Sequence, residues 1–241
     1  MSVLQKSFPR HFRALVFGAQ GGIGAALVDA LSARCEVYPI SRRDTANMQF
    51  ADICDGASLA QLAATLDRTG PFHLIINATG LLHEAASDIH PERSIKHVEA
   101  ASMARLFEVN AIGPALVMRY FLPLLARDDK AVMAHLSARI GSISDNRIGG
   151  WTGYRAAKAA QNMIVKNAAI ETARRDRKKI IVGLHPGTVD TPLSAPFQNN
   201  VPAEKLFTPA QSAAYLLTVI DDLTPDNSGH VFAWDGAQIP A

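Results

Sequence analysis

Short apolar runs alternate along this chain with longer segments of helical period, and this alternation limits the folds open to it. The runs are rich in Val, Ile and Leu at consecutive positions, which is typical of strands buried on both faces. Helices between such strands predict an α/β fold with a doubly wound parallel sheet. We expect strands at residues 13–17, 36–40, 73–77, 131–136, 180–185 and 230–234. We expect helices at residues 22–33, 58–67, 102–126, 152–175 and 209–221.

The chain has 241 residues, a length that one α/β domain accommodates. No internal repeat, low-complexity stretch or linker interrupts it near the middle, so we expect residues 1–241 to form a single domain. The longest irregular segment covers residues 186–208 and contains Pro192, Pro196 and Pro202. A loop of that length in a compact domain is usually functional, and we expect a lid over a substrate.

The composition excludes several classes of protein. Hydrophobic residues make up 48% and charged residues 19%, with a formal net charge of +2 and no run of five like charges. We therefore expect neither disorder nor a nucleic-acid partner. No apolar stretch is long enough to span a membrane, and the first residues lack an export signal. Two cysteines, Cys35 and Cys54, are too few for a disulfide framework, so we expect a soluble cytoplasmic protein.

A glycine-rich turn joins the first expected strand to the first expected helix. Glycine permits a positive φ, lets a pyrophosphate approach the backbone and lets the helix pack closely on the strand. The N-terminus of the helix would face the phosphates. A turn without a ligand is the alternative, but the position favours a dinucleotide site with contacts at Gly18, Gln20, Gly22, Ile23 and Gly24.

Five ordered motifs carry a resemblance to a known family. They are Gly18-x-x-x-Gly22-x-Gly24, Asn77-Ala78-Thr79-Gly80, Val109-Asn110-Ala111, Tyr154-x-x-x-Lys158 and Pro186-Gly187. Over nearly its whole length the chain resembles the short-chain dehydrogenase/reductase family, above all its C-factor-like and carbonyl-reductase-like members. The resemblance implies a Rossmann-like fold, hydride transfer between a nicotinamide cofactor and a carbonyl or alcohol, and a homodimer or homotetramer. It also implies cofactor contacts at Asn77, Ala78, Gly80, Tyr154, Lys158, Pro186, Gly187, Val189 and Thr191.

The end of the second strand decides which dinucleotide is preferred, because an acidic residue there would bind the ribose hydroxyl of NAD. This chain has Ser41, Arg42 and Arg43 instead. Guanidinium groups suit a dianionic 2′-phosphate, so we expect NADP(H) to be favoured over NAD(H). Ordinary solvated arginines are the alternative. Asp52 and Ile53 resemble the family's contacts to the adenine ring.

Tyr154 and Lys158 lie four residues apart on an expected helix, so both side chains project from one face. A phenol can give a proton to a carbonyl oxygen or take one from an alcohol, but its pKa near 10 is too high without help. A neighbouring ammonium favours the phenolate, which is the role expected of Lys158. Asn110 resembles the asparagine through which the family relays protons from the lysine to solvent.

The serine expected to bind the carbonyl oxygen is where the chain departs from the family. The usual position holds Ala138, while Ser137 precedes it. Three possibilities stay open: Ser137 faces the site, Ser142 substitutes from the loop, or no serine completes the set. We adopt the hypothesis that Ser137 is catalytic and points into the cofactor cleft, with Ala138 pointing away.

Other activities find little support. Three histidines at intervals of seven lack clustered partners of metal-ligand type, so we expect no metal, and no G-x-S-x-G elbow indicates a hydrolase. The rival hypothesis is a cofactor-binding signalling or scaffold protein with poor turnover, because C-factor-like relatives and Ala138 both raise it.

Overall fold

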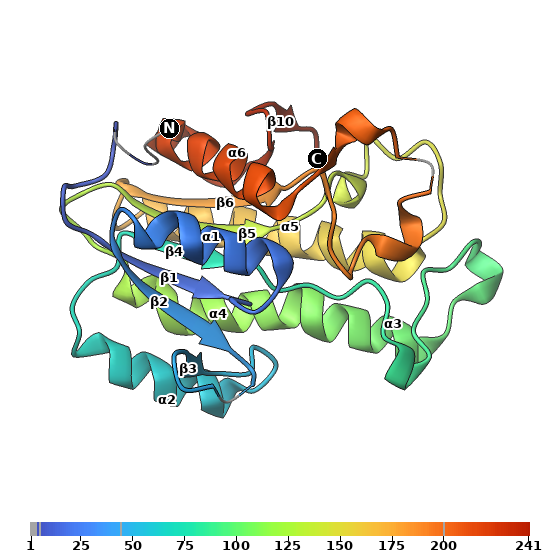
Figure 1. Cartoon of the computed structure of the whole chain (residues 1–241), viewed down its shortest axis with the longest axis horizontal. Helices are drawn as coiled ribbons and strands as arrows, with labels where there is room; N and C mark the ends of the chain where they lie inside the picture. The colour runs from blue at the N-terminus through green and yellow to red at the C-terminus, as the bar shows by residue number, and fades with distance from the viewer. Residues whose placement is uncertain (1–3, 5, 44, 200) are drawn as a thin grey trace.

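An eight-stranded sheet with the order β10-β9-β6-β5-β4-β1-β2-β3 runs through the molecule (Figure 1). The computed structural model describes residues 4, 6–43, 45–199 and 201–241, so Asn200 of the expected lid lies outside the description. The strands of this sheet are β1 (Arg13–Phe17), β2 (Glu36–Ser41), β3 (Gln49–Phe50), β4 (Leu74–Asn77), β5 (Ala131–Leu136), β6 (Lys179–His185), β9 (Val231–Ala233) and β10 (Gln238–Ile239). The expected parallel pairing is confirmed throughout, except that β10 adds an antiparallel edge which the sequence did not predict.

Helices cover both faces of the sheet, as a doubly wound fold requires. They are α1 (Gly22–Ser32), α2 (Gly56–Asp67), α3 (Ala100–Phe107), α4 (Gly113–Phe121), α5 (Thr152–Ala173) and α6 (Pro209–Asp222). In Figure 1, α1 and α6 lie together on one face, and α2 and α4 lie on the other. Successive strand residues feed the two cores alternately: Val16 packs with α1 and α6, whereas Leu15 and Phe17 pack with α2 and α4.

The helix expected at residues 102–126 is not continuous. It consists of α3, a π-helical turn η3 (Glu108–Ile112), α4 and a final 3₁₀ turn η4 (Leu122–Leu124). Pro114 cannot donate to the carbonyl of Asn110 four residues earlier, and Gly113 N donates instead to Glu108 O. The π turn places Asn110 at its centre, fully buried.

Four parallel strands end at the same edge of the sheet, and the expected motifs follow them there. The glycine turn follows β1, the Ala78–Gly80 stretch follows β4, Ser137 follows β5 and Pro186 follows β6. In open α/β sheets, ligands bind outside these carboxyl ends. The topology therefore gathers residues that are far apart in the sequence at one place.

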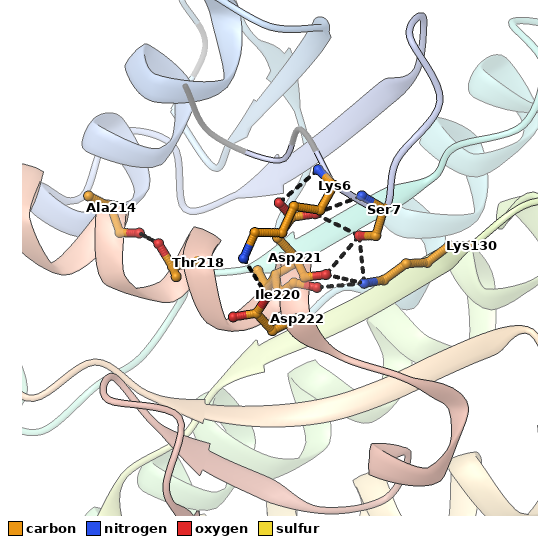
Figure 2. A network of polar contacts seen from close by, with 8 residues as sticks. All are labelled: Lys6, Ser7, Lys130, Ala214, Thr218, Ile220, Asp221 and Asp222. Atoms are coloured by element: carbon orange, nitrogen blue, oxygen red, sulfur yellow. Dashed lines mark hydrogen bonds and ion pairs between the residues drawn. The ribbon is translucent and has the colours of Figure 1, made fainter. Parts of the chain in front are cut away.

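A polar network lies at the opposite end of the parallel strands, where β5 begins (Figure 2). Lys130, just before β5, donates from Nζ to Ser7 Oγ at 2.8 Å and to the carbonyl oxygens of Ile220 at 3.0 Å and Asp221 at 2.8 Å. The Asp221 carboxylate accepts from the backbone N–H groups of Lys6 and Ser7, each at 3.1 Å. The network ties the N-terminal segment to the end of α6.

No helix in the described part of the chain is long and apolar enough to cross a membrane.

Candidate active site

The turn after β1 is built so that only glycine fits at its key positions. Gly18 has a φ of +75°, and a Cβ there would lie 3.1 Å from the backbone of Ala78. A Cβ on Gly24 would overlap the carbonyl oxygen of Gly18, because α1 starts directly against the turn. A Cβ on Gly22 would lie 2.6 Å from the Thr191 side chain. The turn thus forms a cradle in contact with both β4 and the 186–208 segment.

A cavity of about 310 Å³ opens beside this turn. Nine of the expected cofactor residues line it: Gly18, Gln20, Ser41, Arg42, Arg43, Asp52, Ile53, Ala78 and Gly80. The sequence did not identify several further lining residues, including Thr79, Cys54, Glu84 and Arg105. The cavity joins the ends of β1, β2 and β4, and its size and glycine floor fit the adenosine side of a dinucleotide.

The cavity wall at the end of β2 carries the expected cations. Ser41 is buried and its Oγ accepts from the backbone N–H of Arg43 at 2.9 Å, which fixes the turn that displays both arginines. Arg42 and Arg43 themselves are exposed. Asp52 uses one oxygen to accept from Cys54 N at 2.9 Å. Within the described residues, no hydrogen bond is made to the other oxygen of Asp52, which could accept from a ligand.

The cavity is also lined by an ion-pair cluster that the sequence did not reveal. Arg105 donates to Glu108 at 2.7 Å and lies 3.7 Å from Glu84. A hydrogen bond from Ser87, together with Arg105 and Arg42, lowers the pKa of Glu84. Arg42 and Glu84 thus both line the cavity, and the charge of Arg42 acts on Glu84.

Asn110 fastens the loop after β4 to the π turn. Its Oδ1 accepts from Leu81 N at 3.0 Å, and its Nδ2 donates to Leu81 O at 2.7 Å and Leu106 O at 2.9 Å. A Cβ on Gly80 would lie 3.5 Å from Asn110 Oδ1 and 4.0 Å from Lys158 Nζ. Asn110 and Lys158 therefore both border Gly80, and the hydrogen bonds of the Asn110 side chain in the described part of the chain all go to backbone groups.

Tyr154 and Lys158 lie one turn apart near the start of α5, and both are buried. Lys158 Nζ lies 5.8 Å from the centre of the Tyr154 ring and donates to Leu136 O at 2.8 Å and Gln161 Oε1 at 2.9 Å. Burial lowers the pKa of Lys158 to about 7 and raises the pKa of Tyr154 well above its usual range. The phenol is thus protonated at neutral pH, where Lys158 is only partly charged. The expected lowering of the Tyr154 pKa by Lys158 is not found, because burial sets this pKa.

Gln161 is a site residue that the sequence reasoning missed. It is buried, accepts from Lys158 and donates to the same Leu136 carbonyl at 3.3 Å. A polar residue three positions after Lys158, on the buried face of α5, was the signal that could have identified it.

The expected orientation of Ser137 is wrong. Ser137 N donates to Leu184 O at 2.8 Å, so the pleat of β5 continues through this residue and sends its side chain toward α5. There Ser137 Oγ donates to Asn162 Oδ1 at 2.6 Å. Ala138, by contrast, packs in the apolar cluster that contains Tyr154. The alternative, Ser142, donates from Oγ to Ala241 O at 3.4 Å and accepts from Asp145 N at 3.1 Å, and its expected substitution for Ser137 stays a prediction.

The 186–208 segment folds over this region. Its elements are β7 (Thr188–Val189), η6 (Ala195–Phe197), η7 (Ala203–Lys205) and β8 (Leu206–Phe207). Gly187 has a φ of +78°, and Phe207 fills the space where its Cβ would lie. Val189 pairs with Phe207, and Pro186 O accepts from Ser212 at 2.9 Å.

Phe197 of this segment reaches the apolar cluster around Tyr154. Its ring lies 4.8 Å from that of Trp151 and 5.9 Å from that of His83. The shared members of the cluster are Leu81, Leu82, Ile89, Leu106, Ala138, Ile140, Trp151, Tyr154 and Phe197. The reactive phenol is therefore surrounded by apolar and aromatic side chains.

Comparison with known proteins gives a consistent result. A family model described as short chain dehydrogenase matches residues 13–202. The C-signal protein of Myxococcus xanthus is 36% identical over 174 residues, 71% of this chain and 94% of that protein. A 1-hydroxy-2-glutathionyl-2-methyl-3-butene dehydrogenase of Rhodococcus sp. (strain AD45) is 32% identical over 232 residues, 92% of this chain and 96% of that protein.

Solved structures agree on the fold. The NADPH-bound carbonyl reductase from chicken fatty liver superposes with a TM-score of 0.81 at 23% identity, covering 98% of this chain and 97% of that one. The carbonyl reductase Sniffer of D. melanogaster gives a TM-score of 0.81 at 19% identity, covering 96% of this chain and 100% of that one. With its Rossmann-like sheet, glycine turn and Tyr154–Lys158 pair, the chain belongs to the short-chain dehydrogenase/reductase family.

Proposed function

We propose that this protein is an NADP(H)-dependent oxidoreductase that transfers a hydride between the cofactor and a small carbonyl or alcohol substrate. The observation that carries the proposal is the buried Tyr154–Lys158 pair beside the glycine cradle at the carboxyl edge of the sheet. Family membership supports an oxidoreductase, and one related fold was solved with NADPH bound.

The cofactor assignment rests on the cavity wall. Ser41, Arg42 and Arg43 would hold the 2′-phosphate, because two exposed guanidinium groups and a serine stand there. Asp52 and Ile53 would contact the adenine, and the turn at Gly18 and the N-terminus of α1 would receive the pyrophosphate. When bound, the nicotinamide supplies or accepts the hydride.

Tyr154 is the proton donor in this proposal. Burial raises its pKa, so the phenol keeps its proton at neutral pH and can give it to a carbonyl oxygen that gains a hydride. The phenolate left behind would be stabilised by the ammonium form of Lys158, whose Nζ lies 5.8 Å from the ring centre. Asn110 holds the loop at Gly80 and Leu81 in place through backbone hydrogen bonds, and its expected part in proton relay stays a prediction.

Ser137 enters the proposal in a changed role. Its bond to Asn162 ties the end of β5 to α5 one turn beyond Lys158, so it would act by positioning the strand end rather than by touching the substrate. The carbonyl oxygen would then meet Tyr154 next to the methyl group of Ala138.

The 186–208 segment is proposed to act as the substrate lid. Thr191 lies against Gly22, and Phe197 reaches the Tyr154 cluster, so one segment touches both the cofactor cradle and the phenol. An apolar substrate group would take a place among these side chains.

We extend the proposal to a homo-oligomer in the cytoplasm. Met163 and Ile170 are 61% and 47% exposed on α5, which supports contact between α5 and a second copy. The free thiols of Cys35 and Cys54 fit a reducing compartment. Light scattering on the purified protein tests the first point.

The test of the proposed function combines binding and turnover. We expect NADPH to bind at least about tenfold more tightly than NADH, a difference of about 1.4 kcal/mol, and to be oxidised by members of an aldehyde and ketone panel. Arg42→Ala should abolish the preference, whereas Arg68→Ala, at an exposed arginine outside the cavity, should keep it. Equal affinities would remove the NADP(H) assignment, and NADPH binding without turnover of any carbonyl would favour the signalling or scaffold hypothesis.

A further inference from the structure

The start of α5 has an unusual backbone. Gly149, Gly150 and Trp151 are consecutive residues with positive φ, at +70°, +66° and +52°. For a bulky residue such as Trp151 this conformation is strained and persists only where the surroundings impose it. Trp151 is also the N-cap residue of α5, and its side chain makes no capping hydrogen bond. Another part of the chain must therefore hold the beginning of this helix.

Glu92, from the loop between β4 and α3, provides that hold. Its backbone oxygen accepts from Trp151 N at 2.6 Å, and its side-chain Oε1 accepts from Gly153 N at 3.1 Å. A Cβ on Gly153 would lie 2.9 Å from the same Oε1, so the approach depends on glycine. One residue thus binds two of the amide groups that flank the N-terminus of the catalytic helix.

The burial of the Glu92 carboxylate lowers the stability of the fold more than a helix cap alone requires. Glu92 is 5% exposed, and its Oε2 is buried without a hydrogen-bond partner within the described residues. A buried carboxylate oxygen without a partner loses its hydration and gains no bond in return. A serine or aspartate at the N-cap position could accept from the free amide groups of α5 without burying an unpaired carboxylate oxygen. This cost points to a function for the carboxylate in placing the first turn of α5.

Tyr154 comes directly after Gly153, whose amide Glu92 holds. Trp151, on the other side, packs its indole against Phe197, and all three rings belong to one cluster. We propose that Glu92 is a positioning residue for the acid/base Tyr154, acting through the first turn of α5, and that it also sets the wall formed by Trp151. This inference rests on the proposed function of Tyr154.

Glu92 accepts two hydrogen bonds from the start of α5, which we call the Glu92 clamp, and its negative charge strengthens the bond to its side chain. A carboxylate at a helix N-terminus interacts favourably with the helix dipole, and its bond to an N–H group is charge-assisted. A glutamine at position 92 would keep an acceptor oxygen but not the charge. Glu92→Gln should therefore keep most of the positioning, whereas Glu92→Ala should lose it.

The test compares Glu92→Ala, Glu92→Gln and a matched control, Glu99→Ala. Glu99 precedes α3 in the same loop, but it is exposed and makes no capping bond. We expect Glu92→Ala to lower kcat by about tenfold to a hundredfold, the cost of misplacing a catalytic group, with the affinity for NADPH unchanged. Glu92→Gln should stay within about threefold of the parent, and Glu99→Ala should equal it.

Two measurements without substrate complete the test. In Glu92→Ala, the amides of residues 151–154 should exchange hydrogen faster, and the ring signal of Tyr154, assigned by its loss in Tyr154→Phe, should shift in the NMR spectrum. Should Glu92→Ala fail to fold, the same measurements are made on Gly153→Ala. Its added methyl group would crowd Glu92 Oε1 and Leu106, and so weaken the hydrogen bond between Glu92 and residue 153.

The outcomes separate this inference from the proposed function. Unchanged exchange and an unchanged Tyr154 signal in Glu92→Ala, or a kcat within twofold of the parent, would overturn the positioning role. A parent protein that reduces no carbonyl would overturn the proposed function, while the exchange and NMR measurements would still decide whether Glu92 holds Tyr154.

Discussion

Two lysines lie at opposite ends of β5 and have different surroundings. Lys130, which is half-buried, precedes the strand and donates three hydrogen bonds, to Ser7, Ile220 and Asp221. Lys158, which is fully buried, reaches the other end from α5 and donates to Leu136 O and Gln161 Oε1. Burial lowers the pKa of both, to about 8 for Lys130 and about 7 for Lys158.

The charged groups near each lysine explain why the pKa of Lys158 is lower than that of Lys130. The carboxylates of Asp221 and Asp222 oppose the effect of burial at Lys130, whereas burial alone sets the pKa of Lys158. An ammonium group buried among neutral acceptors costs stability, and such groups are characteristic of functional sites. The comparison therefore favours a structural role for Lys130 and agrees with the proposed chemical role of Lys158.

The largest effect should come from the partner of Lys158. Tyr154→Phe removes the proton donor and should lower kcat by about two to four orders of magnitude. The variant should bind NADPH like the parent, since the ring and its packing remain. Steady-state kinetics and a cofactor titration measure the two quantities, and a kcat equal to that of the parent would mean that the acid lies elsewhere.

Lys158→Met should lower kcat by about a hundredfold, because the phenolate loses its stabilising charge. Its unfolding free energy should not fall, because removing the desolvation cost of the buried ammonium offsets the loss of its two hydrogen bonds. Denaturant titration beside kinetics checks both. A clear loss of stability with normal kcat would reverse the assignment of the two lysines.

Lys130→Met should show the opposite pattern. Loss of three hydrogen bonds from an ammonium group should cost about 1 to 3 kcal/mol of unfolding free energy. The kcat per folded molecule should not change, since the network lies at the far edge of the sheet (Figure 2). A variant as stable as the parent would show that the N-terminal segment does not depend on this clasp.

The smallest effect concerns pH. The pKa of Lys130 is about 8 in the folded state and 10.5 without burial, so the unfolded chain binds more protons between these values. The unfolding free energy of the parent should rise with pH across this window, and the stability cost of the charge should be complete below about pH 8. Lys158 adds to the same slope from about pH 7. Lys130→Met should flatten the slope, and an identical slope would contradict the lowered pKa.

Much of the fold could be predicted because its signals are local. The apolar runs at β1 and β5 give the observed bounds of those strands, since strands buried on both faces leave an unbroken apolar pattern. The short strands β3 and β10 have two residues each and left no such pattern. The π turn at Asn110 was missed because a helical period does not reveal where a proline has removed one donor.

Site residues that belong to sequence motifs could be predicted. Site residues that are defined by contacts between distant parts of the chain were missed. The glycine turn and the Tyr154–Lys158 spacing were visible in the sequence, and the structure places them at one edge. The direction of Ser137 depended on whether β5 continued for one more residue, and its bond to Leu184 shows that it does. Glu92 meets Gly153 across 61 positions, a contact that only the folded chain creates.

The most direct measurement tracks the hydride itself. The parent protein is given NADPH in which deuterium replaces both hydrogens on the reactive carbon of the nicotinamide, together with a panel of aldehydes and ketones. We expect deuterium on the carbinol carbon of the alcohol product, formed at least about a hundredfold more slowly by Tyr154→Phe. An alcohol without deuterium, or no alcohol from any carbonyl although NADPH is bound, would contradict the account.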